Sequence, residues 1–303
     1  MKVKEEIESC TFPLHSLSTF PFTFRRMPTR YWVDDLSPYL VQFSEHIGIR
    51  WYGLSYLAGF LVAGWLFGRY ARRGRTTIPA DDVWNGLLLA LMAGVMIGGR
   101  VGSYFLYGAW RNFRNDPIEI LRPWEGGMAS HGGFVGVALA LWWYARWRRI
   151  TFVHIGDVVA STVPAGLFFG RLANFINGEL WGRVTYVKWA VIFPRSMPNT
   201  PLERVFPRHP SQLYEAALEG LLLLAYLQWR FWKTDVVRTR PGRLAGEFLI
   251  GYALVRAFGE QFREPDAGVS LIFGLTRGTF YSIFLFMAGL ILWLRRPAAP
   301  VSE

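Results

Sequence analysis

The side chains best suited to chemistry lie in residues 170–185, which read GRLANFINGELWGRVT. This stretch follows an apolar run long enough for most of a membrane helix, and it places Arg171, Asn174 and Asn177 three residues apart. That spacing puts the three side chains along one broad side of a helix. An ionisable group inside a membrane helix costs roughly 2.5–3.5 kcal/mol, so it indicates a functional site. The alternative is a polar helix end in the lipid headgroup layer, with Arg171 extended toward water.

A histidine lies among glycines in residues 126–136, GGMASHGGFVG. Glycines allow a tight turn and a close approach of the backbone to a ligand. Histidine is the side chain used most often as a general base, so His131 is a candidate for that role. A histidine that makes one structural hydrogen bond at a helix start explains the pattern equally well.

A third polar set follows helical spacing. Tyr252, Arg256, Glu260 and Arg263 are separated by steps of four, four and three, so one face of a helix carries all of them. A polar stripe in a membrane must face something polar, which places this stripe in the interior of a helix bundle. The alternative is an internally neutralised helix in which Arg256 pairs with Glu260.

Two further motifs are weaker. Residues 208–219, RHPSQLYEAALE, place Pro210 where the first turn of a helix tolerates its missing donor. We interpret this motif mainly as a capped helix start at an aromatic belt. Trp51 and Tyr52 open an apolar run and are explained as interfacial anchors.

The elements that carry these residues are predicted to be membrane helices, because apolar runs of near membrane-spanning length recur throughout the chain. We predict an all-α integral membrane protein with seven transmembrane helices, at about residues 50–67, 83–105, 131–147, 152–174, 212–232, 244–262 and 278–294. Tight basic clusters follow the first, third, fifth and seventh of them. Basic residues beside spans mark the cytoplasmic side, so the N-terminus is predicted outside and the C-terminus inside.

Details of the chain refine this frame. Gly94, Gly98 and Gly102 show the close-packing pattern of membrane helices, and Arg100 among them needs a polar partner. Asp157, Pro164 and Gly166 are expected to make the fourth span irregular. Residues 31–50 are predicted to be interfacial, 107–130 an outer loop, and 178–210 a small extracytoplasmic head domain inserted in the domain 31–303. Residues 1–30 are predicted to be a weakly ordered extension; the alternative is that they are not translated and that the protein starts at Met27.

Composition agrees with a membrane environment. Of the 303 residues, 52% are hydrophobic, and the formal net charge is +11. The basic residues cluster beside apolar runs instead of forming one stripe, which argues against nucleic-acid binding. The one cysteine, Cys10, excludes a disulfide framework and a thiolate metal site. Because arginine forks bind phosphate, the residues indicate a protein that handles an anionic lipid headgroup at the outer leaflet.

Six motifs in order resemble the prolipoprotein diacylglyceryl transferase family: RWYGLSYLAGF, GGRVGSY, GGMASHGG, GRLANFINGELWGR, RHPSQLYEAALEG and GEFLIGYALVRAFGEQFREPD, within about residues 48–295. The resemblance implies a multi-pass enzyme of the bacterial inner membrane. Its reaction would transfer diacylglyceryl from phosphatidylglycerol to the lipobox cysteine thiol of a preprolipoprotein signal peptide. A thioether forms and glycerol 1-phosphate leaves, which is the first step of lipoprotein maturation.

The resemblance also implies site residues. His131, Arg171 and Arg256 match the family's catalytic positions, and the substrate site would include Arg171 and also Tyr52, Asn174, Glu179, Gly182, Tyr252 and Glu260. We expect a cavity open to the outer leaflet between the first, third, fourth and sixth spans. No metal or organic cofactor is implied. The chain departs from the family pattern at Ala173, where glycine is usual, and in its last span, TRGTFYSIFLF.

Two other functions are compatible with the residues. A lipid transporter or flippase would use the same arginines to bind headgroups without any bond being broken. An intramembrane protease would use Ser130 and His131, but adjacent residues project in different directions and no oriented third partner is evident.

Overall fold

The computed structural model describes residues 31–43, 48–106, 116, 118, 129–265 and 271–295. The chain divides into two units, residues 1–30 and 31–303. The expectations for the N-terminal extension fall outside the described residues, as do those for nearly all of the loop 107–130.

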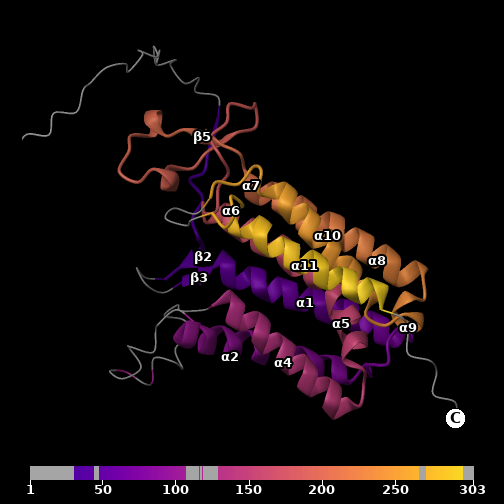
Figure 1. Cartoon of the computed structure of the whole chain (residues 1–303). Helices are drawn as coiled ribbons and strands as arrows, with labels where there is room; N and C mark the ends of the chain where they lie inside the picture. The colour runs from indigo at the N-terminus through magenta and orange to yellow at the C-terminus, as the bar shows by residue number, and fades with distance from the viewer. Residues whose placement is uncertain are drawn as a thin grey trace, which may run out of the picture. The chain divides into compact units, whose positions relative to one another are not determined.

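Helices occupy each of the seven predicted segments (Figure 1). They are α1 (Trp51–Arg72), a π-helical turn (Val83–Leu88) that runs into α2 (Leu89–Leu106), α4 (Ser130–Arg148), α5 (Phe152–Ala160) with α6 (Val163–Ile176), α7 (Ser211–Glu215) continued by a π-helical stretch (Ala216–Leu222) and α8 (Leu223–Lys233), α10 (Arg243–Gly259) and α11 (Arg277–Leu294). A short helix, α9 (Val236–Thr239), links α8 to α10.

Three of these helices are long and apolar enough to cross a membrane: Trp51–Arg72, Val83–Phe105 and Arg277–Leu294. The pair α5 and α6 makes a fourth span if it is counted as one, although it bends by 42°. Pro164 stands in the first turn of α6, where a proline starts a helix without losing a hydrogen bond. The chain is therefore a mostly helical, multi-pass membrane protein, and the count of seven spans stays a prediction.

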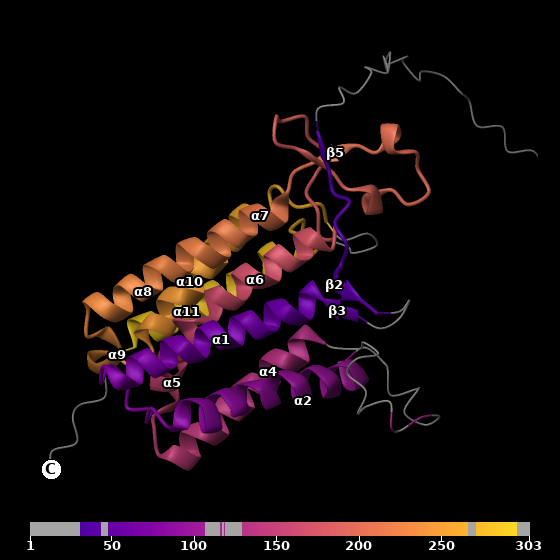
Figure 2. The ribbon, with the colours of Figure 1, turned by 180° about the vertical axis from the view of Figure 1, so that it is seen from behind.

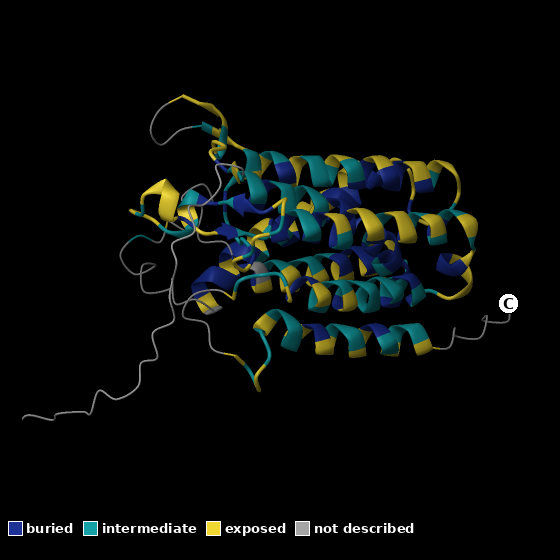
Figure 3. Cartoon of the chain, turned by 90° about the horizontal axis from the view of Figure 1, so that it is seen from above, coloured by how far each residue is buried: buried dark blue, intermediate teal, exposed yellow. Residues whose placement is uncertain are grey.

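The outer faces of the helices are apolar. Phe105, Phe134 and Ile291 are 79%, 74% and 68% exposed, and further large hydrophobic side chains lie exposed along α1, α2, α4 and α11. Viewed from above, exposed positions line the outward sides of the helices, while buried positions lie where helices face one another (Figure 3). Apolar surface of this extent suits a lipid environment and not water.

Glycines set three helix contacts in the bundle (Figure 2). A Cβ on Gly94 would lie 2.8 Å from the Gly136 carbonyl oxygen, and one on Gly102 would lie 2.5 Å from the Gly132 Cα, so α2 and α4 touch backbone to backbone. The predicted role of the α2 glycines is confirmed. Glycines also bring α1 against α6 and α10 against α11, at Gly59–Gly166 and Gly246–Gly289. Arg100 is buried in α2 with its guanidinium over the Tyr104 ring.

The basic ends of the helices meet at one end of the bundle. Arg75, after α1, pairs with Asp235 at 2.8 Å, and Arg238 of α9 donates to the Gly74 carbonyl oxygen. Asp157 of α5 is fully buried there, and its two carboxylate oxygens accept 2.7 Å hydrogen bonds from the backbone N–H groups of Gly242 and Ala245. These are donors that the start of α10 leaves unpaired. Asp157 is therefore a cap for α10 supplied by another helix. The predicted irregularity of the fourth span is confirmed, because this span consists of two helices, α5 and α6, that bend by 42°.

Short strands gather at the opposite end. In one sheet, β1 (Trp32–Val33) pairs in parallel with β4 (Val191–Ile192), which pairs antiparallel with β5 (Pro207–Arg208). A second sheet joins β2 (Tyr39–Gln42) to β3 (Gly48–Arg50). The sequence did not predict strands in residues 31–50. Residues 178–210 do lack a long helix, but their role as an extracytoplasmic head stays a prediction.

Candidate active site

Three helical segments bring charged side chains together near the strand-bearing end. Arg171 lies in the second half of α6, Glu215 ends α7, Glu219 lies in the π-helical stretch, and Arg256 lies near the end of α10. The contacts among them are direct hydrogen bonds and ion pairs. We call these four residues, with Glu260 and Arg263, the arginine–glutamate cluster.

Arg171 contacts two carboxylates at once. Its Nε and one Nη both donate to the same Glu219 oxygen, at 3.0 and 2.9 Å, and its other Nη lies 3.0 Å from a Glu215 oxygen. The arginine side chain is 14% exposed, whereas the two carboxylates are 1% and 0% exposed. Arg171 is therefore held by two buried carboxylates, and a small part of its side chain is exposed.

Arg256 contacts the same two carboxylates. One Nη donates to Glu215 at 2.7 Å and lies 3.5 Å from Glu219, while the other donates to Glu260, one helical turn further along. The pair of Arg256 with Glu260, which the alternative interpretation of this helix required, is therefore present. It does not isolate the arginine, because Glu215 and Glu219 join it to Arg171.

The charges of the cluster balance. Arg263 lies 3.7 Å from Glu215, so the three arginines Arg171, Arg256 and Arg263 face the three glutamates Glu215, Glu219 and Glu260. Buried charges are tolerated when they are paired and hydrogen-bonded. A neutral cluster of this kind can be buried in a membrane protein while it still holds several N–H donors in place.

The loop after α6 is fixed by side chains that flank the cluster. The Glu179 carboxylate accepts hydrogen bonds from the side-chain amides of Asn174, at 2.8 Å, and Asn177, at 3.3 Å. Its backbone carbonyl accepts from the Gln212 amide at 2.5 Å, and Ser211 donates to the Leu180 carbonyl. Gln212 and Ser211 are buried, so the loop is attached to the first turn of α7.

Gly182 lies in a place too narrow for a side chain. A Cβ there would lie 2.5 Å from the His209 carbonyl oxygen and 2.6 Å from that of Phe262. Its own N–H donates to the His209 carbonyl, and the neighbouring N–H of Arg183 donates to Phe262. Gly182 thus joins the loop after α6 to the residues before α7 and after α10.

His131 lies in the first turn of α4 and contacts Tyr281 of α11, with ring centroids 6.2 Å apart. One turn earlier on α11, Gly278 packs on the cluster: a Cβ there would lie 2.9 Å from an Arg256 Nη. The histidine and the arginines are therefore linked through the first turns of α11.

Two predicted tyrosines differ in their surroundings. Tyr252, on α10, is close enough to Glu219, Arg256 and Arg171 to interact with them electrostatically. Tyr52, in the first turn of α1, is 38% exposed and its ring contacts Tyr56. The structure thus joins Tyr252 to the cluster and places Tyr52 in an aromatic pair on α1.

Burial shifts the pKa values of two side chains just outside the helices. It lowers the pKa of His209 below its usual value, and the Nδ1 of this ring lies 3.1 Å from the Tyr214 hydroxyl. Burial also lowers the pKa of Arg208, against the opposing effect of Glu264. His209 is therefore expected to be neutral near pH 7.

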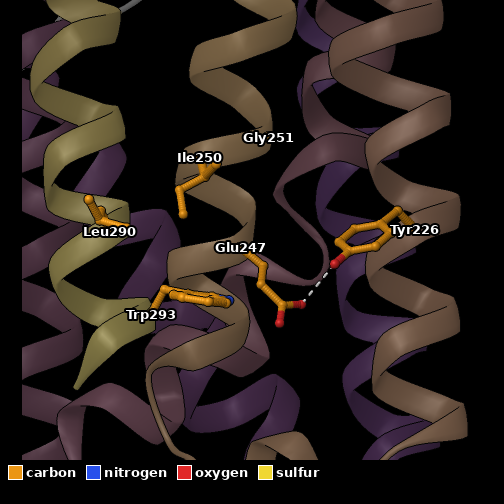
Figure 4. A pocket seen from close by; sticks show the side chains of 6 residues that line it. All are labelled: Tyr226, Glu247, Ile250, Gly251, Leu290 and Trp293. Carbon is orange, nitrogen blue, oxygen red and sulfur yellow. Dashed lines mark hydrogen bonds between the residues drawn. The ribbon is translucent and has the colours of Figure 1, made fainter. Parts of the chain in front are cut away.

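A second charged group lies toward the basic end. Arg230 forms a two-point contact with Glu247, at 2.7 and 2.6 Å, and Arg243 approaches the same carboxylate at 3.5 Å. Glu247 also lines an open groove of about 410 Å³ together with Tyr226, Ile250, Gly251, Leu290 and Trp293 (Figure 4). This group contains none of the predicted site residues. Among the described residues no cluster of histidine, cysteine, aspartate and glutamate could hold a metal ion.

Comparison with known proteins identifies the family. The family model of prolipoprotein diacylglyceryl transferases matches residues 38–295. The chain belongs to this family. It is 44% identical over 273 residues to the phosphatidylglycerol–prolipoprotein diacylglyceryl transferase of Rhodospirillum rubrum, covering 88% of this chain and 95% of that protein. It is 46% identical over 259 residues to the enzyme of the same name from Rhodospirillum centenum, covering 84% of this chain and 90% of that one.

The helices that form the cluster are not all the ones that we expected to form the site. We had expected the first, third, fourth and sixth spans, but the cluster is formed by the fourth, fifth and sixth, with the seventh packed on it. The fifth contributes Glu215 and Glu219, which we had not proposed because the motif 208–219 was interpreted as a helix start. The sequence did contain an indication of their role, because two acidic residues four positions apart in a membrane helix lie on one face and need cationic partners.

Proposed function

We propose that this protein transfers the diacylglyceryl group of phosphatidylglycerol to the lipobox cysteine thiol of preprolipoproteins, at the outer leaflet of the bacterial inner membrane. The observation that carries the proposal is the joint position of Arg171 and Arg256, which share Glu215 and Glu219 inside the helix bundle. The names of the relatives favour this substrate pair.

The arginines would bind the lipid phosphate. A guanidinium presents N–H donors in a planar fork that fits two phosphate oxygens. Donors already held in place also stabilise the charge that grows on the leaving phosphate, without reorganisation during the reaction. Because their buried sides are held by carboxylates, Arg171 and Arg256 would direct their remaining donors toward the substrate.

The substrate would supply the nucleophile, since the chain's one cysteine, Cys10, lies in the N-terminal extension, outside the family match. The sulfur of the lipobox cysteine attacks the carbon of the diacylglyceryl group that is bonded to the phosphate oxygen. A carbon–sulfur bond forms, the carbon–oxygen bond breaks, and the electron pair leaves on the phosphate oxygen as glycerol 1-phosphate. We assign the thiol proton to His131, because a thiolate is the reactive form and an imidazole accepts a proton near neutral pH.

The remaining predicted residues would shape the site. Asn174 and Glu179 hold the loop after α6, and Gly182 allows this loop to approach the ends of α7 and α10. Glu260 orients Arg256, and Tyr252 lies beside both arginines. Tyr52 is assigned to the headgroup layer, where the donor lipid would enter. We propose no metal or organic cofactor for this reaction.

The test is a transfer assay with purified protein in vesicles that contain phosphatidylglycerol and a lipobox peptide. We expect the peptide to gain the mass of one diacylglyceryl unit. Arg171→Ala and Arg256→Ala should each abolish this gain while the protein remains folded in the membrane. Full activity in both variants would contradict the role given to the arginines.

The same assay separates the alternatives. A lipid transporter would move phosphatidylglycerol between leaflets and leave the peptide mass unchanged. An intramembrane protease would cleave the peptide. Either result, in place of the mass gain, would replace the proposed reaction.

A further inference from the structure

We infer that Glu219 is a positioning residue for the two arginines: it sets the orientation in which Arg171 and Arg256 meet the lipid phosphate. This inference rests on the proposed function. It concerns a residue of the π-helical stretch Ala216–Leu222 that belongs to neither the predicted catalytic nor the predicted substrate-binding set.

The first support is the geometry at Arg171. A guanidinium has five N–H donors in a fixed plane. Glu219 accepts from the Nε edge, at 3.0 and 2.9 Å, and Glu215 lies 3.0 Å from the other Nη. A carboxylate on the Nε edge fixes the plane of the guanidinium, so a phosphate would have to use the remaining N–H groups of the two Nη atoms, one of which already lies beside Glu215.

The second support is that Glu219 also reaches Arg256, at 3.5 Å. Two guanidinium groups repel each other strongly where water is scarce. A carboxylate that contacts both arginines offsets this repulsion. Glu219 is completely buried, so it can do this without competing for the side from which a substrate arrives.

The third support is that the backbone of Glu219 is held firmly. A Cβ on the next residue, Gly220, would lie 2.6 Å from the Phe168 Cβ and 2.8 Å from its Cα. Phe168 lies three residues before Arg171 on α6, so this contact fixes the distance between the two elements that carry Arg171 and Glu219. π-Helical turns inside α-helices are frequent at functional sites.

A competing role is possible for a carboxylate bound to these arginines: it could imitate the phosphate and block the site until the lipid displaces it. The two roles predict opposite kinetics. If Glu219 blocks the site, removing its charge lowers the KM for phosphatidylglycerol. If it positions the arginines, removing its charge lowers kcat, because the phosphate still binds to a cationic site but in a poorer orientation.

The experiment compares Glu219→Gln with Glu247→Gln in vesicles of defined phosphatidylglycerol content. Both variants replace a buried carboxylate that contacts two arginines, but Glu247 lies at the other charged group, toward the basic end. We expect Glu219→Gln to lower kcat by about 100-fold, the cost of misplacing reacting groups by an ångström, with the KM for phosphatidylglycerol changed less than about 3-fold. Glu247→Gln should keep the wild-type kcat per folded molecule, measured by thermal unfolding of the same preparation.

Wild-type kcat in Glu219→Gln, a fall in KM alone, or an equal loss in Glu247→Gln would each overturn the inference. If Glu219→Gln does not fold, Glu219→Asp keeps the charge but shortens the side chain by one methylene. Its kcat should then fall with little change in KM, and an unchanged kcat would overturn the inference. The wild-type protein controls for the proposed function: without transfer by the wild type the proposed function itself fails, whereas transfer with a fully active Glu219 variant removes only this inference.

Discussion

Arginine and lysine carry the same charge, but only arginine can bind a carboxylate with one edge and a phosphate with another. At the residue scale this distinction matters most at Arg171, whose Nε edge is taken by Glu219. A lysine ammonium is a point charge that can satisfy Glu219 or the substrate, but it cannot keep the planar geometry.

We therefore predict that Arg171→Lys lowers the rate of transfer by at least about 100-fold, the loss typical of removing a preorganised donor to a developing anion. Initial rates of peptide modification measure the effect. Arg75→Lys is the matched control, because Arg75 lies at the basic end in a pair with exposed Asp235. A lysine variant at position 171 that is as active as Arg75→Lys would exclude recognition by a guanidinium fork.

A second residue-scale prediction concerns His209, whose pKa is lowered by burial. Because the unfolded chain binds this proton more readily than the folded chain does, stability is unaffected well above pH 6.5 and decreases as the pH falls below it. His209→Gln removes this pH-dependent contribution to the free energy of unfolding. Thermal unfolding in detergent at about pH 8 and about pH 5.5 should show a smaller acid-induced decrease for the variant than for the wild type. Equal decreases in both proteins would show that His209 titrates as it does in the unfolded chain.

At the element scale, the start of α10 depends on a side chain from another helix. Gly242 precedes α10 with a positive φ of 94° and no local side-chain cap, and Asp157 of α5 takes the free N–H groups instead. Both carboxylate oxygens are used, and asparagine offers only one acceptor oxygen.

We predict that Asp157→Asn destabilises the folded protein by about 1–2 kcal/mol, the usual loss when a helix cap is removed. Chemical or thermal unfolding in detergent measures the change. Asp235→Asn, at an exposed aspartate in a surface ion pair, should cost less than about 1 kcal/mol. If the two variants are equally stable, Asp157 does not contribute to the start of α10.

The sequence predicted the positions of the helices better than it predicted which elements contact one another. Apolar runs and basic clusters placed all seven helical segments, and the spacing of Gly94, Gly98 and Gly102 predicted the α2–α4 contact, because lipid-facing helices follow simple rules of length and spacing. The pairing of β1 with β4 could not be predicted, because each strand has only two residues and the two strands are more than 150 residues apart in the chain.

The candidate site was predicted in part for the same reason. Arg171, Arg256 and Glu260 stood out because charges are costly in an apolar run. The partners of a charge depend on how helices pack, so the sharing of Glu215 and Glu219 between the arginines appears only in the structure.

At the scale of the whole molecule, the basic clusters and the candidate site lie at opposite ends of the helices (Figure 1). This separation favours a topology with the basic end in the cytoplasm and the cluster toward the outer leaflet. Both substrates would then meet on the outer side, where a preprolipoprotein arrives after crossing the membrane.

The topology can be tested with introduced cysteines after Cys10→Ser removes the native thiol. We predict that a membrane-impermeant maleimide added to intact spheroplasts labels Glu203→Cys and does not label Thr239→Cys, since these exposed positions lie at opposite ends. Permeabilised spheroplasts should label both variants, which controls for reactivity. Labelling of Thr239→Cys alone in intact spheroplasts would reverse the topology and place the site in the cytoplasm.

The most direct test of the central claim measures both products of one turnover, the modified peptide and the released glycerol 1-phosphate, in phosphatidylglycerol vesicles. Our account predicts that the wild type forms the two products in equal amounts, and that Arg171→Ala and Arg256→Ala form neither while remaining folded. Phosphatidylglycerol bound or moved without either product in the wild type, or both products formed at the wild-type rate by the two alanine variants, would contradict it.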